Sequence, residues 1–300
     1  MKIQLKSVLL LGGLLALPSL LQAQPTAHYI TGFEGIKGAS LPPPGVYLRD
    51  YTIGYYASRL NTASGQDTKT PNFRAYTIAN VPRVLWITET KFLGGFVGVD
   101  ALLPLVYQNL QAGPGPAKSD TFGIGDFFAE STLSWHTKQF DFAVAAGLHM
   151  PTGDSPNQPY EFMTRAGLGY WTPMLTAGAT WYIDQEKTWA VSALNRYEFN
   201  TEQRNTQVTP GQAYTLEWGV SKTLNKTIDV GVVGYYQQKV TTDTGANAVK
   251  FRDRVAAVGP EVSVAFPKPM LFVSLRYDYE FMAESRAQGH TFALTLTKRF

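Results

Sequence analysis

Side chains that could catalyse a reaction are few in this sequence. It holds four histidines and no cysteine, which excludes disulfides, thiolate catalysis and cysteine-ligated metals. His149 stands near Ser155 and His290 near Ser285, but neither pair forms a His-x-Ser motif or brings a residue that would orient the base. The four histidines also lack the spacing of metal ligands. We therefore expect no enzyme activity, no metal site and no cofactor.

Charged residues recur instead at every second position of long segments. In 271–281 the odd positions are apolar or aromatic, whereas Arg276, Asp278 and Glu280 occupy even ones. The segments 289–300, 212–224 and 140–150 alternate in the same way. Because successive side chains of a strand point to opposite faces, each segment predicts a strand with one apolar and one polar face.

The connections between these segments alternate between long and short, as in outer-membrane barrels. Long polar links fall near 60–72, 109–120, 150–163, 200–211, 241–249 and 284–289, and short links near 88–91, 137–139, 184–187, 224–227 and 266–269. The fold class expected is all-β, a single transmembrane antiparallel barrel of about 12 strands. The strands are expected near 46–60, 73–88, 92–108, 121–136, 140–150, 164–183, 187–200, 212–224, 227–240, 250–266, 270–284 and 289–300.

A soluble periplasmic sandwich or lipocalin-like barrel has the same period of two. Many of the segments are longer than ordinary strands and suit a tilted membrane strand of about 9–11 residues. Prolines 82, 104, 173 and 260 interrupt expected strands, so the register near them is open, as it is throughout 46–60, 73–88 and 250–266.

Residues 1–23 read as a cleaved signal peptide, with Lys2 and Lys6 before a short apolar run. Export of a cysteine-free chain with this pattern indicates the outer membrane of a Gram-negative bacterium. The terminal Phe300 follows an amphipathic strand and resembles the signature by which the outer-membrane assembly machinery recognises its substrates. The near balance of 26 basic and 23 acidic residues gives no reason to expect a nucleic-acid partner, so the partners expected are membrane lipid, that machinery and small solutes.

The polar parity predicts which side chains face the lumen. Such a wall must be hydrated or paired, because isolated buried charges are costly. The lumen and constriction candidates are Phe92, Phe96, Asp100, Glu130, Arg196, Glu198, Glu217, Asp229, Arg276, Asp278, Glu280 and Arg299, together with Asp50, Asp126 and Asp141. An aromatic track for planar solutes is expected from Phe92, Phe96, Phe128, Phe272 and Tyr56, with Met174, although the same rings would also suit packing against a plug.

Residues 24–45 are rich in glycine and proline and do not read as a strand. They form either a periplasmic lead segment or an internal plug, in which Glu34 and Lys37 would meet charges on the wall. The run from Gly32 to Tyr47, with Pro42-Pro43-Pro44-Gly45, and the later Pro151-Thr152-Gly153-Asp154 resemble the outer-membrane protein family named for the meta-pathway of phenol degradation. That resemblance implies an uptake channel more firmly than it implies phenol.

The function expected is passive uptake of small hydrophobic or aromatic compounds into the periplasm. Capture by the loops 109–120 and 150–163, with Pro151, Thr152, Gly153 and Asp154 as a constriction, would precede passage through the lumen and release beside 24–45. A general water-filled porin and a structural or adhesive barrel remain the alternatives.

Overall fold

The computed structural model describes residues 27–113, 118–157, 165–250 and 252–300. The expected signal peptide and residues 24–26 lie outside the described residues. All regular elements of the described part are strands. This part of the chain contains no helix long and apolar enough to span a membrane. The strands are β1 (Gly45–Leu60), β2 (Arg74–Phe92), β3 (Gly95–Leu102), β4 (Leu105–Gln111), β5 (Lys118–Ile124), β6 (Phe127–His136), β7 (Phe140–Met150), β8 (Thr172–Tyr182), β9 (Trp189–Glu198), β10 (Ala213–Leu224), β11 (Ile228–Lys239), β12 (Arg254–Phe266), β13 (Leu271–Glu284) and β14 (Ala287–Arg299).

These fourteen segments make a closed barrel of twelve antiparallel strands. The strand β2 pairs with β3 along its second half and with β4 along its first half, so β3 and β4 are parts of one strand. In the same way β3 pairs with β6 while β4 pairs with β5. Because β1 pairs with both β14 and β2, the sheet has no open seam at its ends. The expected fold class is confirmed.

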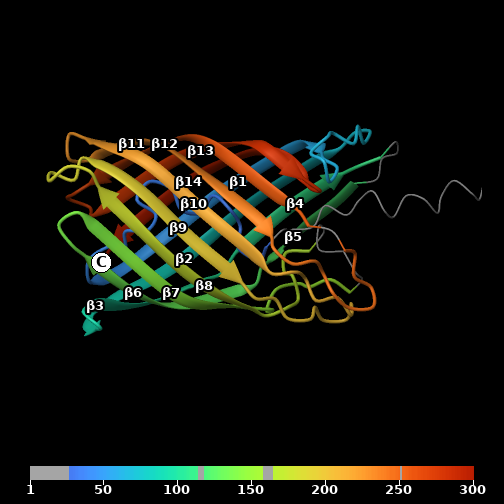
Figure 1. Ribbon diagram of the computed structural model, residues 1–300, viewed down its shortest axis with the longest axis horizontal. Helices are drawn as coiled ribbons and strands as arrows, with labels where there is room; N and C mark the ends of the chain where they lie inside the picture. Colours follow the sequence, from blue (N-terminus) through green and yellow to red (C-terminus); the bar gives the residue numbers. More distant parts are fainter. Residues whose placement is uncertain (1–26, 114–117, 158–164, 251) are drawn as a thin grey trace, which may run out of the picture.

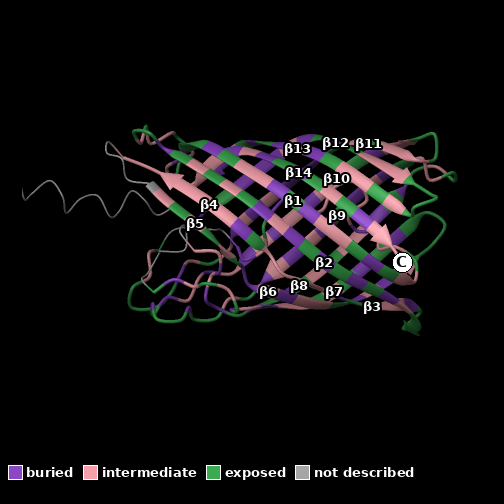
Figure 2. Cartoon of the chain, turned by 180° about the vertical axis from the view of Figure 1, so that it is seen from behind, coloured by how far each residue is buried: buried purple, intermediate pink, exposed green. Residues whose placement is uncertain are grey.

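Alternation along the strands divides the wall into an inner and an outer surface (Figure 2). In β1 the side chains of Tyr51 and Ile53 are buried, whereas Thr52 between them is exposed. The outer surface carries most of the exposed large apolar side chains, such as Leu175 and Leu275. Inner positions alternate with outer ones because the strand period is two, which is why polar residues of one parity gather inside.

Two of the strands are interrupted at the residues that break the ladder. Pro104 has no backbone N–H and separates β3 from β4, and Gly125 with Asp126 separates β5 from β6. A further irregularity in β2, between Ile87 and Lys91, shifts its register against β3. The expected turn at 88–91 therefore lies later, at Leu93-Gly94, where Leu93 has a φ of 51° and Gly94 one of 81°.

Short turns gather at the end of the barrel near the C-terminus and longer connections at the other end (Figure 1). We call the first the periplasmic end and the second the extracellular end, the orientation that short and long connections have in outer-membrane barrels. The expected short links 137–139, 224–227 and 266–269 agree to within one residue with the links 137–139, 225–227 and 267–270 of the structure. One long link is wrong: β13 and β14 are joined through only Ser285 and Arg286, because both strands extend further than the sequence pattern indicated.

Candidate functional site

The segment from residue 27 to 44 lies inside the barrel and is held by carboxylates of the wall; we call it the plug. The backbone N–H of Tyr29 donates to Glu198 at 2.8 Å, that of Gly32 to Glu217 at 3.0 Å, and that of Ile36 to Glu261 at 2.9 Å. These carboxylates satisfy amide groups that a turn-rich segment cannot pair within itself. Acidic side chains on β9, β10 and β12 thus fix the path of the plug.

A guanidinium completes the site around Glu217. Arg196 forms an ion pair with Glu217, and the Tyr29 hydroxyl donates to the same carboxylate at 2.8 Å. The Arg196 guanidinium also lies 4.0 Å from the centre of the Tyr29 ring, a cation–π contact. The predicted residues Arg196, Glu198 and Glu217 are therefore brought together at one level of the plug.

Glu34 of the plug occupies the centre of a second cluster. Its carboxylate lies 3.2 Å from both Arg49 and Arg83 and accepts a hydrogen bond from Tyr51 at 2.9 Å. Arg83 also binds Asp100 at 2.8 Å and Glu130 at 2.7 Å. Burial alone would raise the pKa of Glu34, but the combined attraction of Arg49, Arg83 and Arg196, with the Tyr51 hydrogen bond, lowers it. Glu34 is held as an anion between cations of the wall.

The periplasmic end of the plug has its own anchors. Lys37 lies 3.0 Å from Asp229, and the guanidinium of Arg299 donates to the carbonyl of Pro44 at 2.9 Å. Gly35 lies against the Arg276–Glu261 pair, where a Cβ atom would overlap both side chains. Only glycine allows the plug backbone to approach this closely.

Three predicted lumen residues on β13 face the plug from another side. Arg276 pairs with Glu261 at 3.5 Å and with Asp278 at 3.4 Å, and it donates to the carbonyl of Gly32. Glu280 accepts hydrogen bonds from Tyr55 at 2.9 Å and Tyr235 at 3.0 Å. The charges on β13 serve the plug and the neighbouring wall.

The extracellular end of the plug is attached to a loop through His28 and Asp126. Nε2 of His28 lies 3.0 Å from Asp126, which also accepts the backbone N–H groups of Gly153 and Leu168 at 2.9 and 2.7 Å. The His28 ring stacks on His149 with centroids 4.2 Å apart.

The predicted loop residues Pro151, Thr152, Gly153 and Asp154 contact the barrel rim and each other. Thr152 accepts the N–H of Phe127 at 2.9 Å, and Asp154 pairs with Arg165 at 3.0 Å. Pro151 is buried. Through Gly153 the loop reaches Asp126, and through Asp126 it reaches the plug. The loop that was expected to form a constriction is thus joined to the plug through Asp126.

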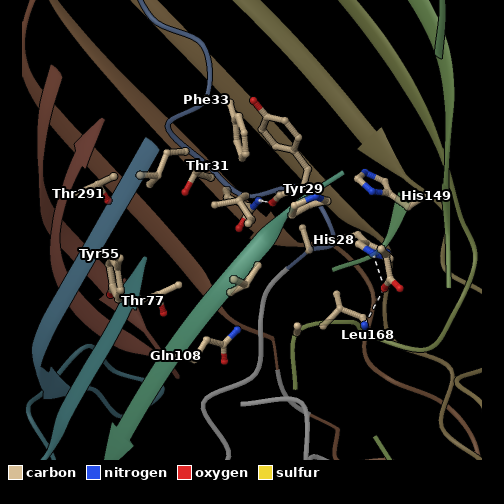
Figure 3. A pocket seen from close by; sticks show the side chains of 18 of the residues that line it. His28, Tyr29, Thr31, Phe33, Tyr55, Thr77, Gln108, His149, Leu168 and Thr291 are labelled. Carbon is tan, nitrogen blue, oxygen red and sulfur yellow. Dashed lines mark hydrogen bonds and ion pairs between the residues drawn. The ribbon is translucent and has the colours of Figure 1, made fainter. Parts of the chain in front are cut away.

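A cavity of about 320 Å³, the upper cavity, lies between the extracellular half of the wall and the plug. Figure 3 shows the plug residues Tyr29, Thr31 and Phe33 between His149 on one side and Tyr55 and Thr77 on the other. Apolar side chains make much of its lining, including Ile53, Leu102, Val106, Leu110, Phe128 and Met174. Its size and lining suit a small apolar solute.

A second cavity of about 200 Å³, the lower cavity, lies on the periplasmic side of the plug. Its lining is richer in hydroxyl and charged groups, among them Ser263, Thr295, Thr297 and Arg49, with Phe272 as an aromatic member. Phe33 and Glu34 line both cavities.

Residues 57–296 match the family model described as "Putative MetA-pathway of phenol degradation". The chain belongs to this family. The family resemblance is confirmed by this match, which spans most of the barrel and includes Pro151–Asp154 but not Gly32–Tyr47. A search of curated proteins finds no match.

Solved structures similar to this family member are outer-membrane barrels. The COG4313 outer membrane channel from Pseudomonas putida F1 has 13% sequence identity and a TM-score of 0.77, over 87% of this chain and 97% of that one. The Pseudomonas putida toluene transporter TodX has 8% identity and a TM-score of 0.48, over 94% of this chain and 96% of that one. At this identity the first likeness establishes the shared barrel fold.

Three predicted inward positions are corrected by the structure of this family member. Phe92 ends β2 beside the turn at Leu93-Gly94, with 58% of its surface exposed. It belongs to β2, whose buried residues have odd numbers, and not to the strand that carries Phe96. Asp50 and Tyr56 lie on the outer face, since the buried residues of β1 around them have odd numbers. Asp50 accepts two bonds from Asn80 there, at 3.0 and 2.9 Å.

The other predicted aromatic residues face inward. Phe128 and Met174 line the upper cavity, Phe272 lines the lower one, and Phe96 packs against the buried cluster of Tyr47, Leu85 and Ile87. Asp141 is buried and accepts a hydrogen bond from Tyr182 at 2.7 Å.

Sequence reasoning missed His28, Arg83 and His149 as parts of the site. His28 precedes the first strand, where no periodicity places a side chain. Arg83 follows Pro82 in a strand of uncertain register, yet its parity with the buried Val81 and Leu85 was a usable signal. His149 shares the inward parity of Asp141, which was another such signal.

Proposed function

We propose that this chain is an outer-membrane channel that passes small hydrophobic compounds into the periplasm, with the upper cavity as the site that receives them. The observation that carries the proposal is this cavity, whose lining surface is mostly apolar although charged residues such as Arg83 and Glu130 also border it. A solute that enters it exchanges water for Ile53, Val106 and Leu110, a transfer favourable by about 25 cal/mol per Å² of apolar surface.

The plug makes a general porin the weaker candidate. Its backbone crosses the lumen and is bonded to Glu198, Glu217 and Glu261 on three different strands. A hydrophilic solute would first meet an apolar cavity, which offers little to replace its bound water. Beyond the cavity it would meet charged groups that are already bonded to the plug. For an apolar solute, transfer from water into this cavity is favourable.

Uptake of a dye tests the proposal in whole cells. N-phenyl-1-naphthylamine fluoresces in apolar surroundings and is excluded by an intact outer membrane. Expression of this chain in a Gram-negative host should raise the rate of dye uptake several-fold over the empty vector.

Two tryptophan variants separate the cavity from the rest of the barrel. Val106→Trp fills the upper cavity and should return dye uptake close to that of the vector. Leu105→Trp is the matched control, because Leu105 is adjacent in β4 but 37% exposed on the outer face, and uptake should stay at the wild-type rate. Both variants must show the folded, heat-modifiable band. Uptake by folded Val106→Trp at the wild-type rate would contradict the proposal.

A further inference from the structure

The upper and lower cavities are separated by two plug residues. Phe33 and Glu34 each line both cavities. The upper cavity is lined mainly by apolar groups, whereas hydroxyl groups and Arg49 are prominent below. A solute that travels from one to the other must pass this pair.

Glu34 is a poor candidate for the moving part. It is tied to Arg49, Arg83 and the Tyr51 hydroxyl, all contributed by the wall. Breaking a buried ion pair by withdrawing one partner is strongly unfavourable, because it leaves an uncompensated buried charge. This cluster forms a rigid frame on one side of the partition.

Phe33 is held differently. Its ring lies edge-on to Tyr51 with centroids 4.9 Å apart, and 5.7 Å from the ring of Tyr29. These are ring contacts without ion pairs, and each is much weaker than a buried ion pair. Gly32 precedes Phe33 and has a φ of 84°, a left-handed backbone conformation that favours glycine. The Phe33 ring is therefore carried by a turn next to a glycine. With cavities on both sides, the ring has space into which it can turn.

We propose that Phe33 is the gate between two solute sites in series, an apolar receiving site above and a hydroxyl-lined release site below. The direction of travel rests on the proposed function. The ring turns while Glu34 stays bound, so the partition opens without breaking the charge cluster. The release site fits an aromatic or other small apolar solute that carries one hydroxyl group, which Thr295, Thr297 and Ser263 can bind.

Ion conductance through single channels in a planar bilayer tests the gate without assuming any solute. Phe33→Ala joins the two cavities and should raise the conductance several-fold over wild type, whereas Phe33→Trp should not raise it. The matched control is Val81→Ala, which truncates the same buried cluster and lines neither of the two cavities. Its conductance should remain near wild type.

Wild-type conductance from folded Phe33→Ala would overturn the gate, as would an equal rise in Val81→Ala, which would indicate general loosening of the plug. Failure of the dye assay with a high current in Phe33→Ala would instead remove the proposed cargo and leave the gate in place.

The release site is tested by a pair of solutes that differ by one hydroxyl. Benzyl alcohol added on the periplasmic side of Phe33→Ala should block the current at lower concentration than toluene, and Thr295→Val should reduce this difference. Equal block by the two solutes would overturn the assignment of the lower cavity.

Discussion

Nε2 of His28 lies 3.0 Å from Oδ2 of Asp126, so the start of the described plug and the break between β5 and β6 are joined by one contact. Asp126 also accepts the N–H groups of Gly153 and Leu168. One carboxylate therefore connects the plug, the wall and the extracellular loop.

We expect Asp126→Ala to release the loop and the upper end of the plug. Three donors lose their acceptor, and each buried unsatisfied donor costs about 1–3 kcal/mol. Hydrogen exchange should accelerate in residues 27–31 and 151–154 together. Asp154→Ala is the control. The Asp154 side chain is 55% exposed, and an exposed ion pair such as that with Arg165 contributes little to stability. Faster exchange in the loop alone would show that the plug has other anchors there.

Arg83→Met should destabilise the barrel strongly. The variant leaves Asp100, Glu130 and Glu34 without their shared guanidinium, and loss of one partner from a buried network costs about 3–5 kcal/mol. Urea unfolding followed by tryptophan fluorescence measures the change. Arg254→Met removes the exposed pair with Glu284 and should cost no more than about 1 kcal/mol. Equal costs for the two variants would mean that the buried network contributes no more than a surface pair.

Gly35→Ala should displace the plug from β12 and β13. The new Cβ atom would overlap Glu261 and Arg276, and overpacking of this kind costs about 1–3 kcal/mol. Limited proteolysis should then cut the plug faster than in wild type. Gly54→Ala is the control because its Cβ would meet nothing within 4 Å. Protection of the plug equal to wild type would show that the Arg276–Glu261 pair can move aside.

Asp184, in the turn between β8 and β9, should make the turn sensitive to acid. Hydrogen bonds from the backbone N–H of Trp189 and from Thr188 lower the pKa of Asp184 from 3.8 to about 2. A lowered folded pKa stabilises the turn above the unfolded value, and this stabilisation is lost as the pH falls from about 4 through 2. Hydrogen exchange of Thr188 and Trp189 should therefore accelerate over that range. A rate in wild type equal to that in Asp184→Ala at neutral pH would contradict this role.

Sequence periodicity was enough to place most wall residues. On β13 and β14 the polar parity is regular, and Arg276, Asp278, Glu280 and Arg299 all contact lumenal partners. The same rule was wrong for Phe92, because the turn lies after it and not before it, so Phe92 follows the parity of β2 and not that of Phe96 on β3. The rule was also wrong for Asp50. This residue was assigned to the lumen because it is charged, although the alternation of its neighbours in β1 places it on the outer face.

The plug could not be placed from sequence for a different reason. Its fixed contacts join Tyr29 to Glu198 and Ile36 to Glu261, residues far apart in the chain. Local patterns carry no information about such pairs. Glu34 and Lys37 were identified as plug charges, but their partners Arg83 and Asp229 emerge only when the barrel closes around them.

The dependence of the plug on distant carboxylates imposes an order on assembly. The residues from 27 to 44 precede every strand, yet their acceptors lie on β9, β10 and β12. Those bonds form only after late strands have joined the sheet, while the pairing of β1 with β14 closes the barrel around the segment. A stretch that is synthesised before every strand is thus among the last to reach its final contacts, and the barrel matures from the wall inward.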